Sequence, residues 1–193
     1  MTSRAREFYQ RLVESPSPVK AIEALVDDRQ PENDYLEFKT GEIGAKEAKH
    51  YWSKVLSGFA NTEGGVLIWG VDARPTASAD DPSVKVDAAC GIIHVKNPLE
   101  FAERLRRVLL EATVHPVAGV EVREFSSESG GFVVCFIPEG RHKPYRAALD
   151  DSKNYYHRVG DSFAVISHGF VVSDRHEANE RVQSQGLVFV NKI

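Results

Sequence analysis

The segment "ENDYLEFKTG", which begins at Glu32, places charged side chains around the apolar pair Leu36 and Phe38. Because side chains alternate along a strand, Leu36 and Phe38 are expected on one face, with Glu37 and Lys39 on the other. Glu32 lies just before this expected strand. Carboxylate oxygens are the ligands that Mg²⁺ and Mn²⁺ prefer, and two or three acids offset the charge of the ion. The segment is therefore a candidate site for a divalent cation.

Asp72 is the candidate third acid, at the end of the nearly all-apolar run "GVLIWGVD". Such a run is typical of a central strand that is covered on both faces. If it runs alongside the first strand, Glu32, Glu37 and Asp72 converge, and Lys39 can stabilise the charge that develops on a phosphate. The alternative is that Glu37 and Lys39 form the solvated face of an edge strand, where charges are common.

The stretch "FANTEGGVLIWGV" predicts the end of a helix, a turn at Gly64 and Gly65, and a buried strand. Glycine lets the backbone approach a ligand closely, so the turn is a candidate phosphate pocket lined by amides. It is not a Walker A loop, because the helix precedes the strand and no Gly-Lys-Ser/Thr follows. The alternative, an ordinary helix end with a tight turn, accounts for the glycines well and is favoured on local grounds.

A basic segment begins at "RHKPYR" and continues for about a dozen residues. Its cations could follow a phosphate backbone, with Tyr145 or Tyr155 stacked on a base. The alternative is a solvated turn between strands, where such residues are usual. The candidate nucleic-acid-binding residues are Arg141, Lys143, Arg146, Lys153 and Arg158.

Composition limits the classes of protein that fit. A net charge of −4 over 193 residues argues against a histone-like basic coat, although a local basic stripe suffices for phosphate contacts. Cys90 and Cys135 have no CxxC spacing, so we expect buried free thiols in a reducing cytoplasm and no zinc site. The first fifteen residues lack the apolar core of a signal peptide, and no run approaches the ~18 apolar residues of a membrane span. We expect a cytoplasmic protein.

Helical and strand patterns alternate along the chain and predict a mixed α/β domain, in which helices flank a mixed sheet. A helical segment is expected over 1–30, the main domain over 31–168, and a tail over 169–193. Residues 73–88, rich in Pro, Ala, Ser and Asp, are expected to form a loop. Further helices are expected over 17–29, 44–63 and 97–112, a hairpin over 118–140, and a last strand over 154–160.

Three blocks, "ENDYLEFK", "SGFANTEGGVLIWGVD" and "YYHRVGDSF", occur in this order over about residues 32–163. Together they resemble the Schlafen-type AlbA-like domain. That family has a glutamate followed after four residues by Glu-Phe-Lys, an Ala-Asn-Thr-x-Gly-Gly turn, and a late Tyr-x-Arg-x-Gly strand. The resemblance implies a single compact α/β lobe, of a kind described as DNA-binding or as a divergent ATP-binding module.

The resemblance also implies a chemistry. In animal Schlafen proteins, two such lobes form a positively charged groove, and three carboxylates support divalent-metal-dependent cleavage of structured RNA such as tRNA. Glu32 and Glu37 match the first two acids, and Asp72 is the best match for the third. The spacing leaves Asp80, Asp81 or Asp87 as alternatives. The implied function is an endoribonuclease that uses Mg²⁺ or Mn²⁺, with Lys39 as a catalytic residue.

The chain departs from the animal pattern in two respects. It holds one lobe, so a groove requires a homodimer or another subunit, and it lacks the cysteines of the animal zinc site. Many bacterial members carry this domain ahead of a helix-turn-helix and bind DNA or regulate. Three hypotheses follow: an endoribonuclease, a non-catalytic DNA- or RNA-binding regulatory domain, and ATP binding at the Gly64–Gly65 turn. RNA is the preferred partner and DNA the second choice, with no membrane contact.

Overall fold

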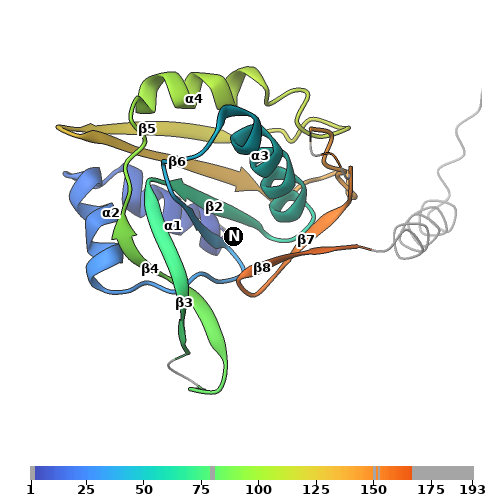
Figure 1. Cartoon of the computed structure of the whole chain (residues 1–193). Helices are drawn as coiled ribbons and strands as arrows, with labels where there is room; N and C mark the ends of the chain where they lie inside the picture. Colours follow the sequence, from blue (N-terminus) through green and yellow to red (C-terminus); the bar gives the residue numbers. More distant parts are fainter. Residues whose placement is uncertain (1–2, 79–80, 150, 152, 167–193) are drawn as a thin grey trace, which may run out of the picture.

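The computed structural model describes residues 3–78, 81–149, 151 and 153–166, and its elements confirm the mixed α/β class (Figure 1). The helices are α1 (Arg4–Val13), α2 (Pro18–Asp27), α3 (Ala45–Ala60) and α4 (Pro98–Arg107). The strands are β1 (Leu36–Lys39), β2 (Gly64–Trp69), β3 (Val71–Ala77), β4 (Lys85–Ile92), β5 (Glu121–Ser127), β6 (Gly130–Pro138), β7 (Tyr156–Val159) and β8 (Ser162–Val165).

A four-stranded sheet in the order β1-β2-β6-β5 forms the centre of the lobe. β1 runs parallel to β2, with Leu36 opposite Val66, and the other pairs are antiparallel. Every residue of β2 is buried, which confirms the predicted central strand. Side chains alternate between the two faces of this strand: Leu67 and Trp69 pack with α3 and α4, whereas Val66 and Ile68 pack with α1. The helices therefore cover both faces, as Figure 1 shows.

The helix predicted over 97–112 begins where expected, although α4 ends at Arg107. The side chain of Asn97 accepts a hydrogen bond from the Glu100 backbone N–H at 3.3 Å and donates to the Glu100 carboxylate at 3.2 Å. Pro98 occupies the first turn, where its missing N–H leaves no helical hydrogen bond unmade. The helix thus begins where its sequence specifies.

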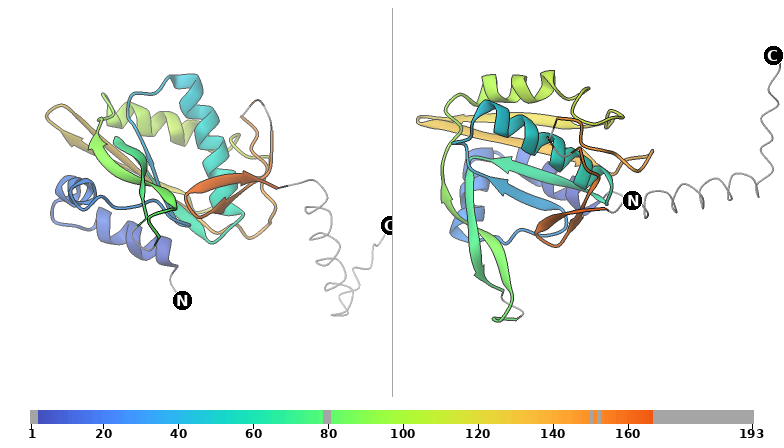
Figure 2. Two further views of the ribbon diagram at one scale, coloured as in Figure 1. Left: turned by 60° about the horizontal axis from the view of Figure 1, so that its bottom comes forward. Right: turned by 45° about the vertical axis from the view of Figure 1, so that its right-hand side comes forward.

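The loop predicted over residues 73–88 is wrong, because most of this stretch forms the antiparallel pair β3–β4. The two strands make a ribbon that projects from the body of the lobe (Figure 2). Pro75 and the small polar residues of this stretch interrupt the alternation of apolar and polar side chains that identifies a strand in a sequence. A proline is tolerated here because Pro75 lies on β3, which pairs along one edge only, with β4, among the described residues.

The two cysteines are free, but only one is buried. Cys135 lies in the core, as predicted, whereas Cys90 on β4 is exposed, so the prediction is wrong for Cys90. Among the described helices, none is long and apolar enough to cross a membrane.

The N-terminal helical segment packs into the core of the main domain. Phe8 and Leu12 of α1, together with Ile22 of α2, share one buried cluster with Leu36 and Phe38 of β1. The predicted tail over 169–193 lies outside the described residues, and the predicted domain boundaries stay predictions.

Candidate functional site

Arg158 lies between the two glutamates of the first motif, and we call Glu32, Glu37 and Arg158 the acid–arginine triad. Glu37 comes from β1, Glu32 from the turn before it, and Arg158 from β7. The residues are 6%, 6% and 4% exposed. The Arg158 guanidinium donates to Glu37 Oε2, and its Nη2 lies 3.6 Å from Glu32 Oε2. The structure therefore brings the two predicted acids together around a buried cation, Arg158, from the block "YYHRVGDSF".

The remaining polar atoms of the triad are also engaged within the chain. Glu32 Oε1 accepts from the Phe38 backbone N–H at 2.9 Å, and the Tyr51 hydroxyl donates to Glu37 Oε1. Arg158 donates through Nε to the carbonyl of Asn33 at 3.0 Å and through Nη2 to that of Leu36 at 2.8 Å. The Nε, Nη1 and Nη2 donors of the planar guanidinium thus each meet a separate acceptor. Only arginine presents three donors in this fixed arrangement.

Burial sets the charge of the triad. Desolvation, followed by the negative charge of Glu37, raises the pKa of Glu32 to about 9, although the Phe38 N–H and Arg158 oppose this shift. Desolvation, aided by Glu37, also raises the pKa of the Tyr51 phenol above its ordinary range. At neutral pH Glu32 is therefore protonated, and the charges of Glu37 and Arg158 cancel. In such a cluster, the attraction between opposite charges and the surrounding hydrogen bonds offset part of the cost of desolvation.

Asp72 does not join the triad. Gly70, at φ 106°, turns the chain after β2, and Asp72 lies on the new strand β3. Its Oδ2 is 2.9 Å from both Nε and Nη2 of Arg74. Within the described ranges, no three His, Cys, Asp or Glu side chains are grouped closely enough to hold a metal ion.

Among the described residues, none of the alternative third acids joins Glu32 and Glu37 in a group of three. Asp81 accepts hydrogen bonds from the backbone and side chain of Ser83. Asp87 lies on β4, and Asp80 is outside the described residues. As Glu32 and Glu37 lie, they do not fit a divalent cation, because the Arg158 guanidinium occupies the face that they share. Binding of Mg²⁺ or Mn²⁺ stays a prediction, and it would require Arg158 to move.

Two lysines lie against the ring of Tyr51, whose hydroxyl donates to Glu37, and we call Lys39, Tyr51 and Lys54 the lysine–tyrosine surface. The ammonium of Lys39 lies 4.3 Å from the centre of the Tyr51 ring, and that of Lys54 lies 6.0 Å from it. Both distances are typical of cation–π contacts. Lys39 forms no ion pair among the described residues. The sequence analysis did not predict Lys54 as a binding residue. Its position three residues after Tyr51 on α3 places both side chains on one face of the helix, and this spacing could have identified it.

The predicted basic segment divides into exposed and engaged residues. Arg141 and Lys153 are exposed, and Arg146 is half-buried. Lys143 donates to the Thr62 carbonyl at 2.8 Å and to Glu139 at 2.7 Å. Arg158 is held inside the triad. Tyr145 is only 3% exposed, so its ring is not available to stack on a base.

The "NTEGG" turn has a packing role that the sequence did not reveal. The Asn61 amide donates to the carbonyls of Tyr145 and Tyr156, both at 2.8 Å, and accepts from the Tyr145 N–H at 2.6 Å. A Cβ on Gly65 would meet the Phe59 ring at 2.3 Å, and Gly64 has φ 83°. These contacts support the structural explanation of the two glycines, and ATP binding at this turn stays a prediction.

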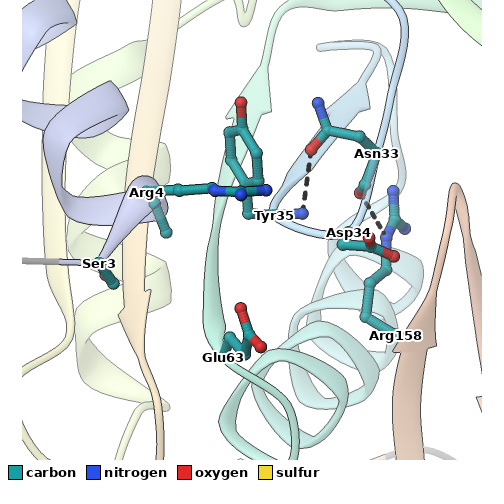
Figure 3. A pocket seen from close by; sticks show the side chains of 8 residues that line it. Ser3, Arg4, Asn33, Asp34, Tyr35, Glu63 and Arg158 are labelled. Carbon is teal, nitrogen blue, oxygen red and sulfur yellow. Dashed lines mark hydrogen bonds between the residues drawn. The ribbon is translucent and has the colours of Figure 1, made fainter.

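A pocket of about 320 Å³ opens beside the triad (Figure 3). Its wall combines the start of α1, the turn before β1, the turn before β2, and β7. All three sequence blocks therefore contribute to one cavity. Its lining residues are Ser3, Arg4, Ala5, Asn33, Asp34, Tyr35, Glu63 and Arg158.

These features define a single AlbA-like lobe with a buried ion cluster. The chain belongs to the Schlafen, AlbA_2 family, whose model matches residues 32–165. This match confirms the resemblance of the three blocks and associates the chain with nucleic acid.

Two solved structures are similar to the chain. The N-terminal domain of a RecG-related protein from Nitrosomonas europaea shares 19% identity over 80% of this chain and 97% of that one, with a TM-score of 0.48. The DIP2311 protein from Corynebacterium diphtheriae shares 13% identity, with a TM-score of 0.48; the match covers 82% of this chain and 28% of that one. No curated protein matches the chain.

Proposed function

We propose that this chain is a nucleic-acid-binding domain that holds a phosphate backbone without cleaving it. One observation supports this function over cleavage: Glu32 and Glu37 are buried against Arg158, and with Glu32 protonated the cluster carries no net charge. Exposed acids would repel a polyanion unless a metal ion intervened. Because the guanidinium supplies that positive charge, the glutamates need no metal in order to coexist with nucleic acid.

The lysine–tyrosine surface is the proposed contact for phosphate. Lys39 and Lys54 contact the ring of Tyr51, whose hydroxyl donates to Glu37, and the triad that Tyr51 touches carries no net negative charge. The exposed Arg141 and Lys153 would extend this contact along the nucleic-acid strand. Binding of this kind is electrostatic and weakens as salt displaces the protein from the phosphates.

Charge reversal by Lys39→Glu is expected to weaken binding of RNA and DNA alike, because phosphate contacts carry no sequence information. The slope of log affinity against log salt should also become shallower, by about 0.7–0.9 for each phosphate that the variant no longer neutralises. Fluorescence anisotropy over a KCl series measures both effects. Lys20→Glu, an exposed position on α2, is the matched control and should behave as the parent. An unchanged affinity and slope for Lys39→Glu would refute the assigned surface.

Preference for structured RNA, and a homodimer that pairs two lobes around a groove, are finer parts of this proposal. They rest on the resemblance of the sequence to the two-lobed animal Schlafen proteins. Comparison of tRNA with duplex DNA at one salt concentration tests the first part. Sedimentation with and without RNA tests the second.

An endoribonuclease acting on structured RNA such as tRNA is the second candidate. The observation that favours it is the adjacency of Glu32 and Glu37, with Lys39 on the neighbouring surface. If it is right, tRNA incubated with the protein and Mn²⁺ is cut, and Glu37→Gln abolishes cutting while binding changes less than about twofold. The exposed Glu42→Gln variant is the control and should cut normally. Intact tRNA after incubation with the folded parent would eliminate this candidate.

A further inference from the structure

The pocket of Figure 3 is lined by polar and charged residues that do not belong to the lysine–tyrosine surface. We propose that it receives one unpaired guanine nucleotide of the bound strand, an inference that rests on the proposed function. The pocket volume, about 320 Å³, lies at the small end of the usual ~300–1,000 Å³ for small-molecule sites. It is therefore suited to one nucleotide and not to a duplex.

The pocket carries opposite charges that do not pair with each other. Arg4, at the start of α1, and Glu63, before β2, are both exposed, and neither makes a side-chain hydrogen bond or an ion pair among the described residues. A ligand that satisfies both must present an anionic group and an edge of hydrogen-bond donors. A nucleotide has this combination, because its phosphate matches arginine and its base can offer N–H groups.

Two residues of the first motif shape the same cavity. One oxygen of Asp34 accepts from the Gly160 N–H at 2.7 Å, which fixes the carboxylate and leaves its other oxygen without a hydrogen bond in the described part of the chain. Tyr35 is half-buried and packs edge-on against Phe8 at 6.0 Å, so its ring is supported from behind. A supported tyrosine ring is a common stacking surface for an unpaired base.

The acids select the base. The pairing edge of guanine presents two adjacent N–H donors, which one carboxylate can accept together. Adenine and cytosine present an amino group beside an acceptor nitrogen. Uracil presents a single N–H between two carbonyls that a carboxylate repels. Glu63 can accept both guanine donors and therefore selects guanine, whereas Asp34, with one oxygen already bonded to Gly160, adds to the repulsion of the uracil carbonyls.

The test compares fluorescein-labelled pentaribonucleotides UUGUU and UUUUU by anisotropy at one salt concentration. The folded parent should bind UUGUU about tenfold more tightly, within the range expected for a good bidentate contact to a base. Glu63→Gln should reduce this preference to near one. Arg4→Ala should weaken both ligands by the same factor. Glu47→Gln and Arg107→Ala change exposed residues outside the pocket and should leave affinity and preference unchanged.

The Glu63→Gln result separates recognition from simple charge. Removing a negative charge beside the bound strand strengthens the binding of any polyanion, so a loss confined to UUGUU can only come from the base. Salt-sensitive binding of both ligands without preference would overturn the guanine pocket and leave the proposed function standing. A preference that survives Glu63→Gln would also overturn it. Failure of the folded parent to bind any RNA or DNA would overturn both.

Discussion

Arg158→Ala is expected to lower the free energy of unfolding by about 3–5 kcal/mol, and the melting temperature by roughly 6–20 °C for a chain of this size. The cost arises because the charged Glu37 stays buried after its counter-charge is removed. The carbonyls of Asn33 and Leu36 are also left without this donor. Urea denaturation followed by circular dichroism measures the change.

A matched arginine and a compensated variant make this experiment decisive. Arg107→Ala removes an exposed guanidinium and should cost less than about 0.5 kcal/mol. Replacing all three residues together, as Arg158→Met with Glu32→Gln and Glu37→Gln, should recover much of the stability, because no charge is then left buried. If Arg158→Ala unfolds within about 1 kcal/mol of the parent, the acids are hydrated in solution. The main support for the binding proposal would then disappear.

Folding stability is expected to fall as the pH rises through the neutral range, and Glu32 is the reason. Its pKa is about 9 in the folded chain, against an ordinary 4.5. Between these values the folded state keeps a proton that the unfolded state has released. Each rise in pH therefore favours unfolding, until Glu32 ionises in both states.

Glu32→Gln should remove this part of the pH dependence. The amide cannot ionise, and its oxygen can still accept from the Phe38 N–H that Glu32 binds. Denaturation curves at pH 6 and pH 9 should show a smaller loss of stability for Glu32→Gln than for the parent. Glu111→Gln, at an exposed position, should keep the parental pH dependence. Parallel pH profiles for the parent and Glu32→Gln would contradict a raised pKa.

The elements that local sequence specifies were predicted well. The all-apolar run of β2 requires cover on both faces, and Asn97, Pro98 and Glu100 mark the start of α4. The adjacency of Glu32 and Glu37 could also be predicted, because both belong to one short segment. The structure confirms each of these features because they depend on neighbours along the chain.

Long-range contacts and changes of direction could not be predicted in this way. Arg158 lies 121 positions after Glu37, and nothing in "YYHRVG" indicates that its arginine is buried and not facing a phosphate. Asp72 follows β2 directly, but the turn at Gly70 places it on another sheet. The partner of a buried charge depends on the tertiary fold, and the sequence pattern of a single strand does not contain it.

The β3–β4 ribbon gives the lobe a part that can vary independently. Its root is anchored by the buried residues Val71, Ala88 and Ala89, whereas Arg74, Pro75 and Ala77 further out are exposed. Lengthening a connection at an exposed tip costs little, about 0.6 kcal/mol for each doubling of a flexible loop. Evolution or an engineer could therefore extend or graft the outer ribbon, and so alter the reach of the domain, without disturbing its electrically balanced interior.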